Sequence, residues 1–340
     1  MSKVLIITHS LDNECIDHVT RKLQDRNAEV IRFNTDLYPG EAALTSEYSE
    51  GTWKYFLNQD GVTHDITNLE SIWYRRSRIG KNLKGKIDRE YLPAVNGEAR
   101  AQFNGFGLAQ ECFVMDPFWR IRSAEAKELQ LKLATKIGLE IPDSLITNDE
   151  RIARQFFDNT TANQHEVVTK MQSSFALTES GKEEVVFTNT LKEEDLDTLE
   201  DLVHCPMQFQ TKIEKAVELR VTIVGTKIFC HQLDSQAHAE AAVDWRRQGE
   251  QLVDDWTPYD LPVEIQEKML KMMDLLQINY GAADIIVTPD GRYVFLEINP
   301  AGEFFWLDRQ ENHAISEEIA KVLLNQAPRR FAPYAPWEAL

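Results

Sequence analysis

The sequence has no long apolar run and comparatively little positive charge. No window of its 340 residues approaches the roughly 18 consecutive apolar residues of a membrane span, and the apolar run at residues 4–7 is too short for a signal peptide. Lys and Arg total 37 against 55 Asp and Glu, which gives a formal net charge of −18. No Lys- or Arg-rich run offsets this charge, so a phosphate backbone would be repelled. We therefore expect a soluble, cytoplasmic protein with no membrane and no nucleic-acid partner.

Cysteine is scarce, and several catalytic motifs are missing. The four cysteines (Cys15, Cys112, Cys205 and Cys230) lie far apart and fit neither a disulfide framework nor a zinc site. The sequence has no Walker A pattern and no Gly-x-Gly-x-x-Gly, which disfavours the usual glycine-loop nucleotide folds. It also has no Ser/His/Asp or Cys/His pattern for nucleophilic catalysis. With 43% apolar and 27% charged residues the composition is that of a globular protein, and the length predicts two or three domains.

The first third of the chain is predicted to form a small α/β domain over residues 1–116. A compact apolar run at 3–9 predicts a buried parallel strand, helical spacing follows over 13–27, and a second strand is predicted at 29–34. This order of strand, helix and strand is a βαβ unit, which is normally right-handed. Further strands are predicted at 52–57 and 71–75, and a further helix at 88–107.

A central region is predicted over residues 117–205, beginning at Pro117. Ser123 is placed to cap one long helix whose apolar stripe includes Leu133, and Gly138 is placed to end that helix. Strands are predicted in this region at 167–171 and 184–188.

A third region is predicted over residues 206–325 and is followed by a tail, residues 326–340. Its elements are two strands, a helix, a hairpin and a final helix. The tail contains three prolines, so we expect it to be extended and poorly ordered. The strands are expected at 208–213 and 219–224, and the helices at 263–276 and 315–324.

The strongest local signal for chemistry is a set of three oxygen-bearing side chains on the predicted hairpin. Glu297 and Asn299 are two residues apart on one strand and therefore share a face. A four-residue turn at 288–291 would place Asp284 on that face, whereas a three-residue turn would place it on the other. Carboxylate and amide oxygens suit Mg²⁺, although two solvated acids on an edge hairpin would give the same pattern. The apolar residues expected on the opposite face are Val294, Leu296 and Ile298.

Two lysines are candidates for binding phosphate beside such a metal. Lys170 ends an apolar strand, where its ammonium group would reach phosphate oxygens as a point charge. Lys127 lies in the first turn of its predicted helix, at the end where the helix dipole favours anions. Each lysine taken alone is better explained as a solvated side chain, so the prediction depends on the combination.

In that combination the chain resembles the ATP-grasp superfamily, and more narrowly the microviridin-type graspetide ligases. Those enzymes close side-chain lactones or lactams in a ribosomal precursor peptide. The resemblance extends to about residue 325 and implies an α/β (α+β) fold of three parts around an ATP cleft. The residues that carry it are Lys127, Lys170, Gln210-Thr211-Lys212-Ile213, Glu218-Leu219-Arg220, Asp244-Trp245-Arg246, Asp284 and Glu297-Ile298-Asn299-Pro300, together with Trp73-Tyr74-Arg75-Arg76, Leu129-Gln130-Leu131, Val168-Thr169-Lys170-Met171 and residues 218–225 and 295–306.

The resemblance implies a role for each position around the nucleotide. Lys127 and Lys170 would hold the phosphates of ATP, and Arg220 would stabilise charge on the transferring phosphoryl group. Mg²⁺ would lie between the phosphates and the side chains of Asp284, Glu297 and Asn299. The adenine and ribose contacts would come from Gln210, Thr211, Lys212, Ile213 and Glu218. The loop at 172–182 contains a single glycine, Gly181, and its phosphate contacts are left open.

The resemblance also implies contacts with a ribosomal precursor peptide. Asp244 and Arg246 match an Asp-x-Arg motif that contacts the core peptide, and Asp244 would either orient the arginine or accept a hydroxyl proton. Glu194 and Asp195 would bind an arginine of the leader peptide, although acids at a helix start are also good capping residues. Arg75, Arg76 and Arg78 would line the cleft from the first domain or lie in solvent near a strand end. A homodimer is common among such ligases.

The expected reaction activates an Asp or Glu side chain of the peptide as an acyl phosphate and closes an ω-ester to Ser or Thr. Two alternatives in the same enzyme class are an ω-amide with Lys and the addition of a free amino acid, as in ribosomal-protein glutamate ligases. An alternative outside enzymes is a nucleotide-binding sensor or scaffold with the same fold. Retention of every charged position disfavours the last alternative.

Overall fold

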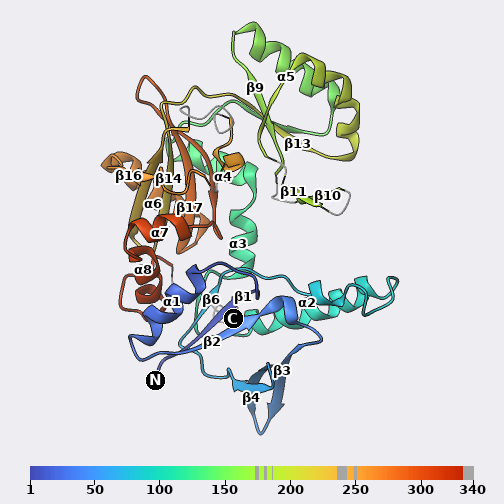
Figure 1. Cartoon of the computed structure of the whole chain (residues 1–340), viewed down its shortest axis with the longest axis vertical. Helices are drawn as coiled ribbons and strands as arrows, with labels where there is room; N and C mark the ends of the chain where they lie inside the picture. The colour runs from blue at the N-terminus through green and yellow to red at the C-terminus, as the bar shows by residue number, and fades with distance from the viewer. Residues whose placement is uncertain (173–175, 180–181, 186, 236–242, 249–250, 332–340) are drawn as a thin grey trace.

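The computed structural model describes residues 1–172, 176–179, 182–185, 187–235, 243–248 and 251–331 (Figure 1). Within these ranges the chain forms an N-terminal α/β unit, a central sheet with its helices, and a C-terminal antiparallel sheet. The predicted mixed α/β architecture is therefore confirmed. No helix in these ranges is long and apolar enough to cross a bilayer.

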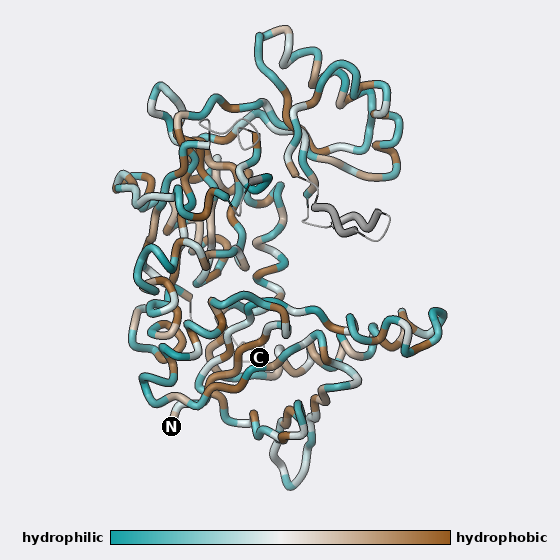
Figure 2. Tube along the Cα trace, in the orientation of Figure 1, coloured by the Kyte–Doolittle hydropathy of each residue, from teal (hydrophilic) through white to brown (hydrophobic). Residues whose placement is uncertain are grey.

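The N-terminal unit is built on a parallel sheet with the strand order β2-β1-β6-β7. Strand β1, helix α1 and strand β2 form the predicted βαβ unit. Strand β1 lies between β2 and β6 and is buried on both faces, which explains its continuous apolar run. Figure 2 shows hydrophobic residues concentrated along these strands. The bounds are Lys3–Thr8 (β1), Cys15–Gln24 (α1), Glu29–Asn34 (β2), Ser71–Tyr74 (β6) and Phe113–Met115 (β7).

A second, three-stranded sheet and the helix α2 extend from this unit. The strand predicted at 52–57 is the middle strand of that sheet, β4. Its neighbours β3 and β5 were not predicted, because most of their residues are exposed and give no clear apolar pattern. The bounds are Thr35–Leu37 (η1), Ala42–Ser49 (β3), Thr52–Gln59 (β4), Val62–Asp65 (β5), Lys81–Leu83 (η2) and Leu92–Leu108 (α2).

Two helices replace the single helix predicted from Ser123. Helix α3 spans Phe118–Ala124 and α4 spans Lys127–Lys136, so Ser123 lies inside α3 and caps nothing. Extended backbone at Ala126 separates the two helices and makes Lys127 the first residue of α4. The predicted end is confirmed, since Gly138 has φ +78° directly after the C-cap of α4.

The central sheet has the strand order β12-β9-β13-β8 and packs against helix α5 and the 3-10 segment η3. Strand β13 follows the boundary predicted at residue 206 but pairs with β8 and β9, so it belongs to this sheet. The domain boundaries themselves stay a prediction. The bounds are Ser144–Thr147 (β8), Glu150–Ala162 (α5), Val167–Lys170 (β9), Asn189–Leu191 (β12), Glu193–His204 (η3) and Met207–Thr211 (β13).

The strand predicted at 184–188 overlaps one observed strand, and only at its first two residues. Strand β11 spans Lys182–Val185 and forms a separate two-stranded sheet with β10, Ala176–Glu179. Residue 186 lies outside the described residues, and β12 begins only at Asn189.

The C-terminal sheet is antiparallel, with the strand order β16-β15-β14-β17-β18. Helix α6 covers one face, where its Met269, Met272 and Met273 are fully buried against residues such as Ile285. The bounds are Val217–Val224 (β14), Lys227–Leu233 (β15), Trp245–Gln248 (η5), Thr257–Pro258 (β16), Val263–Leu276 (α6), Tyr280–Val287 (β17), Tyr293–Asn299 (β18), Phe305–Gln310 (α7) and Ala314–Leu323 (α8).

The β17–β18 hairpin differs in register from the prediction but keeps the predicted grouping. Val287 pairs with Tyr293 across a five-residue turn, and a bulge follows between Ile285 and Asp284. The bulge places Asp284 directly opposite Glu297, on the same face. It also turns Leu296 towards that face, so the prediction that Leu296 and Val294 point away was wrong.

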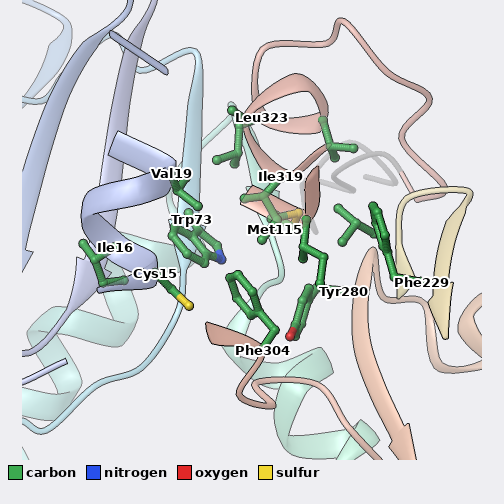
Figure 3. Packing of buried hydrophobic residues seen from close by; sticks show 14 of the residues in the cluster. Cys15, Ile16, Val19, Trp73, Met115, Phe229, Tyr280, Phe304, Ile319 and Leu323 are labelled. Carbon is green, nitrogen blue, oxygen red and sulfur yellow. The ribbon is translucent and has the colours of Figure 1, made fainter. Parts of the chain in front are cut away.

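The N-terminal and C-terminal units share a hydrophobic core (Figure 3). Helix α1 packs against α8, and Trp73 and Met115 of the first sheet meet Tyr280 and Phe304 of the third region. In residues 326–331, the described part of the tail, the prediction of poor order was wrong, because the backbone N–H of Phe331 donates to Asn279 Oδ1 at 3.0 Å. Residues 332–340 lie outside the described residues.

Candidate functional site

A cavity lies where the central sheet faces the C-terminal sheet. It is open to solvent and contains about 720 Å³ of space between the atoms. Its walls come from β9 and β13 on one side and from β14, β17 and β18 on the other. Most of the predicted site residues line it: Lys170, Gln210, Thr211, Lys212, Ile213, Glu218, Asp244, Arg246, Asp284 and Glu297.

The three predicted metal ligands share one face of the β17–β18 hairpin. Asp284 and Glu297 are directly opposite each other, and Asn299 lies two residues further along β18. Two predicted cations, Arg220 and Lys127, contact the two acids. Arg220 Nη1 donates to Asp284 Oδ1 at 2.8 Å, and Lys127 Nζ donates to Glu297 Oε2 at 2.6 Å.

Charges around Glu297 keep it ionised. Burial alone would favour the neutral acid, but Lys127, Lys170 and Arg246 hold the pKa of Glu297 well below its usual range. Burial also lowers the pKa of Lys170, and the Glu297 carboxylate opposes that shift. Within the described ranges Lys170 forms no ion pair, so its ammonium group is available to an anionic ligand.

The donor set fits Mg²⁺ and a triphosphate. Asp284, Glu297 and Asn299 supply the hard oxygen ligands that Mg²⁺ prefers, and each is held by a neighbour within the protein. Few protein ligands are present, which is typical of a magnesium ion that also binds phosphate oxygens. Lys170 enters the same cavity and would contact those phosphates.

Arg220 is held rigidly at the floor of the site. Its side chain is buried, and Nη2 donates to the backbone carbonyl of Glu303 at 3.1 Å while Nη1 holds Asp284. The guanidinium group also lies 5.9 Å from the ring centre of Trp306. A Cβ atom at Gly302 would lie 2.8 Å from Arg220 Nη2, so glycine leaves room for the arginine.

The predicted adenine segment forms the outer end of the cavity. The side chain of Gln210 is buried and donates to Ser144 Oγ at 2.8 Å, and Lys212 Nζ contacts Glu166 at 2.6 Å, so neither is free for the base. The N–H groups of Thr211 and Lys212 are also used within the sheet. The backbone of Ile213 makes no such contact among the described residues, and it is the part of this segment best placed to bind adenine.

Lys215 is a site residue that the sequence analysis did not identify. It lines the cavity, and its buried Nζ donates to Glu218 Oε1 at 2.9 Å and to the carbonyl of Val243 at 3.1 Å. Burial raises the pKa of Glu218, although Lys215 opposes the shift. The feature of the sequence that could have identified Lys215 is its spacing of three residues from Glu218. Lys215 links the predicted ribose residue to the segment that carries Asp244.

Asp244 and Arg246 form a planar pair at the rim of the cavity. Arg246 Nε donates to Asp244 Oδ1 at 2.8 Å and Nη2 donates to Oδ2 at 2.7 Å. Burial disfavours the charged acid, but these bonds hold the pKa of Asp244 below its usual value. The Thr188 N–H also donates to Asp244 at 3.1 Å. These bonds fix the orientation of the arginine, whose side chain is 46% exposed.

A cluster of three tryptophans fixes this segment. The Trp245 ring centre lies 5.1 Å from that of Trp256 and 5.4 Å from that of Trp306. Because Trp245 stands between Asp244 and Arg246, its packing fixes the position of both. The sequence shows these aromatic residues but gives no indication that they meet.

Glu194 and Asp195 lie away from the cavity, at the start of η3. Asp195 accepts the backbone N–H of Lys192 at 2.8 Å, which is the capping role considered in the sequence analysis. Glu194 contacts Lys192 Nζ at 3.3 Å and its side chain is 75% exposed. Binding of a leader-peptide arginine by these two acids stays a prediction.

The N-terminal unit reaches the site through Glu303. Arg75 is buried and its Nη2 donates to Glu303 Oε2 at 2.7 Å, while Arg76 forms a second ion pair with the same carboxylate. Arg76 also donates to the carbonyl of Ala301 at 3.1 Å. Both arginines thus hold the loop between Asn299 and α7, and neither is a solvated side chain as the alternative interpretation proposed.

Comparisons with known proteins agree with this geometry. Residues 3–122 match the family of the MvdD pre-ATP grasp domain. A RiPP-associated ATP-grasp ligase from Chryseobacterium gregarium is 41% identical, with a TM-score of 0.92 over 98% of this chain and 100% of that one. The macrocyclase MdnC from Microcystis aeruginosa MRC is 39% identical (TM-score 0.85, covering 96% and 100%), and MdnB from the same organism is 32% identical (0.79, covering 95% and 99%). No functionally curated protein sequence matches the chain.

The fold and the cavity define an ATP-grasp ligase. The chain belongs to the family of RiPP-associated ATP-grasp ligases, where RiPP denotes a ribosomally synthesised and post-translationally modified peptide. The resemblance found in the sequence is confirmed by these relatives over nearly the whole chain.

Proposed function

We propose that this protein uses ATP and Mg²⁺ to activate Asp or Glu side chains of a ribosomal precursor peptide and to close ω-ester links to its Ser or Thr residues. One observation carries the proposal: a single cavity is lined by residues 210–213, by the carboxylates Asp284 and Glu297, and by Lys170, which forms no ion pair with another described residue. The relatives support it. The Chryseobacterium ligase forms a complex with ADP and a leader and core peptide, and MdnC binds the precursor peptide MdnA.

The proposed reaction has two steps. A peptide carboxylate oxygen attacks the γ-phosphorus of ATP, the bond to the ADP oxygen breaks, and an acyl phosphate forms. A hydroxyl oxygen of the same peptide then attacks the acyl carbon, phosphate leaves, and the hydroxyl proton passes to solvent or a base. The peptide loses one water for each ring. Both steps gather negative charge on oxygens, so positioned cations provide most of the catalysis.

Each cationic residue of the site would have a role set by its position. Lys170 and Lys127 would hold the phosphate oxygens, and Arg220 would stabilise charge at the phosphoryl group that is transferred. Bound Mg²⁺ would neutralise phosphate charge, held by the acids of β17 and β18 together with Asn299. Arg246 presents a fork of donors that matches a carboxylate of the core peptide.

The test is to incubate the enzyme with ATP, Mg²⁺ and a candidate precursor peptide, chosen from any short open reading frame next to its gene, and to weigh the product. We expect the loss of one water per ring together with ADP formation, and rings that open in hydroxide. Rings that resist hydroxide would indicate amides instead of esters. A gain in mass would show amino-acid addition, and the absence of any peptide product would overturn the proposal.

The cellular setting follows from the substrates. Because a newly synthesised peptide and ATP meet in the cytoplasm, we propose that the enzyme acts there. A homodimer stays a prediction.

A further inference from the structure

A positively charged segment stands out against the acidic chain. Residues 75–89, called here the basic segment, link β6 to α2 and carry a net charge of +6, whereas the whole chain carries −18. Its charges do not form a continuous run in the sequence, because apolar and small residues space them. The basic residues are Arg75, Arg76, Arg78, Lys81, Lys84, Lys86 and Arg89.

The basic segment is an ordered structure. The N–H of Gly80, which has φ +77°, donates to the carbonyl of Tyr38 at 2.9 Å, and Asn82 Nδ2 donates to the carbonyl of Leu37 at 3.0 Å. Leu83 is buried and holds the middle of the segment against the N-terminal core. The backbone is thus anchored, and the charged side chains project from a fixed base.

The inner end of the segment adjoins the active site. Arg76 contacts the carbonyl of Ala301 and the carboxylate of Glu303. The carbonyl of Glu303 in turn accepts Arg220 Nη2, which places this end one residue away from the phosphoryl-transfer machinery.

The outer end of the segment carries most of its exposed charges. Lys86 pairs with Glu41 at 2.6 Å. The remaining outer residues are exposed and form no ion pair with another residue that the structure describes. They are Arg78, Lys81, Lys84 and Arg89. Figure 1 shows that α2, which follows the segment, extends away from the sheet.

We propose that the basic segment is a docking surface for the acidic part of the substrate peptide and guides it from α2 to the active site. This inference rests on the proposed function, since a peptide whose Asp and Glu side chains react must carry negative charge. The rest of the protein is acidic and repels such a peptide, so attraction is concentrated on this segment. The inner arginines stay paired with Glu303, and the outer four charges bind the peptide.

The test compares two triple variants. K81Q/K84Q/R89Q removes three outer charges of the segment. K54Q/K132Q/K271Q removes three exposed lysines from β4, α4 and α6 and serves as the matched control. For each protein we would measure the KM for the peptide, the KM for ATP and kcat, at low salt and at about 0.3 M NaCl, where charges more than about 6 Å apart are screened.

We expect the peptide KM of the segment variant to rise about tenfold at low salt, with kcat and the KM for ATP unchanged, because the lost charges act on encounter and binding. At high salt the difference from wild type should shrink to less than about threefold. The control variant should behave as wild type. An unchanged peptide KM in the segment variant, or an equal rise in the control, would overturn the inference.

Two further observations separate this inference from its premises. If wild-type enzyme forms no dehydrated peptide, the proposed function fails; if it does so and the segment variant has normal kinetics, only the docking surface fails. A fluorescein-labelled oligo(U) RNA tests the alternative polyanion by anisotropy. Tighter binding of that RNA than of a labelled Asp- and Glu-rich peptide would overturn the assignment to a peptide.

Discussion

At the residue scale, the site is a balance of opposite charges on side chains that are mostly buried. Glu297 stays ionised because Lys127 donates to it and Lys170 lies nearby, in spite of its burial. Arg220 and Asp284 form a second pair beside the first. Buried pairs of this kind add little net stability, since desolvation offsets the attraction. We interpret them as preorganised charge, ready for a metal and a triphosphate.

The substitution E297Q removes the negative charge of one predicted metal ligand and keeps the size of the side chain. We expect kcat for ADP formation with peptide to fall at least about 100-fold, because metal binding and phosphate positioning both depend on this carboxylate. The matched control is E264Q, which removes an exposed acid paired only with Lys268. A coupled assay for ADP measures both. Activity of E297Q within threefold of wild type would contradict the assignment of Glu297.

At the scale of elements, the bulge in the β17–β18 hairpin and the loop after β18 build the site. The bulge brings Asp284 opposite Glu297 and turns Leu296 into the cavity. The loop places the carbonyl of Glu303 against Arg220, and its carboxylate connects to the N-terminal unit. The loop of residues 299–303 therefore connects the predicted metal ligand Asn299, the side chain of Arg220 and the N-terminal unit.

The substitution E303Q tests that connection. Loss of the charge leaves buried Arg75 without its anion, so we expect the thermal midpoint to fall by a few degrees and kcat to fall about tenfold. The KM for ATP should change little, because the adenine segment lies on the central sheet.

The control for this variant is E140Q, which breaks an ion pair with Arg292 on the surface. Kinetics and thermal melts of both proteins provide the comparison. A fall in thermal midpoint with unchanged kcat would show that Glu303 has a structural role only.

Part of this site was predictable from the sequence and part was not. The two-residue period of a strand predicts that Glu297 and Asn299 share a face, and the order of motifs along the chain indicates the remaining cavity residues. The bulge between Asp284 and Ile285 is a change of strand register that no local pattern reveals. The roles of Glu303, Lys215 and the tryptophan cluster arise from contacts between segments distant in sequence, so only the folded chain shows them.

At the scale of the whole molecule, a buried acid joins the N-terminal sheet to the C-terminal sheet. Asp116 follows β7 and accepts hydrogen bonds from the backbone N–H groups of Asn279 and Tyr280, both at 2.9 Å. Burial raises the pKa of Asp116 to about 6, although these donors oppose the shift. The tail completes the junction, since Phe331 also binds Asn279.

This pKa makes stability depend on pH in a definite direction. The folded protein binds the Asp116 proton more tightly than the unfolded chain, so ionisation of Asp116 costs stability above about pH 6, and this cost is relieved as the pH falls. Relative to D116N, wild type should gain about 1 kcal/mol of unfolding free energy between about pH 7.5 and about pH 5. Urea titrations of both proteins at the two values measure this. A difference that does not vary with pH would contradict the raised pKa.

The central claim is that the cavity activates a peptide carboxylate as an acyl phosphate, and oxygen isotope transfer tests it most directly. The peptide would be prepared with ¹⁸O in its Asp and Glu side chains and incubated with enzyme, Mg²⁺ and ATP. We predict that each ring formed releases ADP and one phosphate that contains a single ¹⁸O atom. Release of AMP and pyrophosphate, or of phosphate without the label, would contradict it.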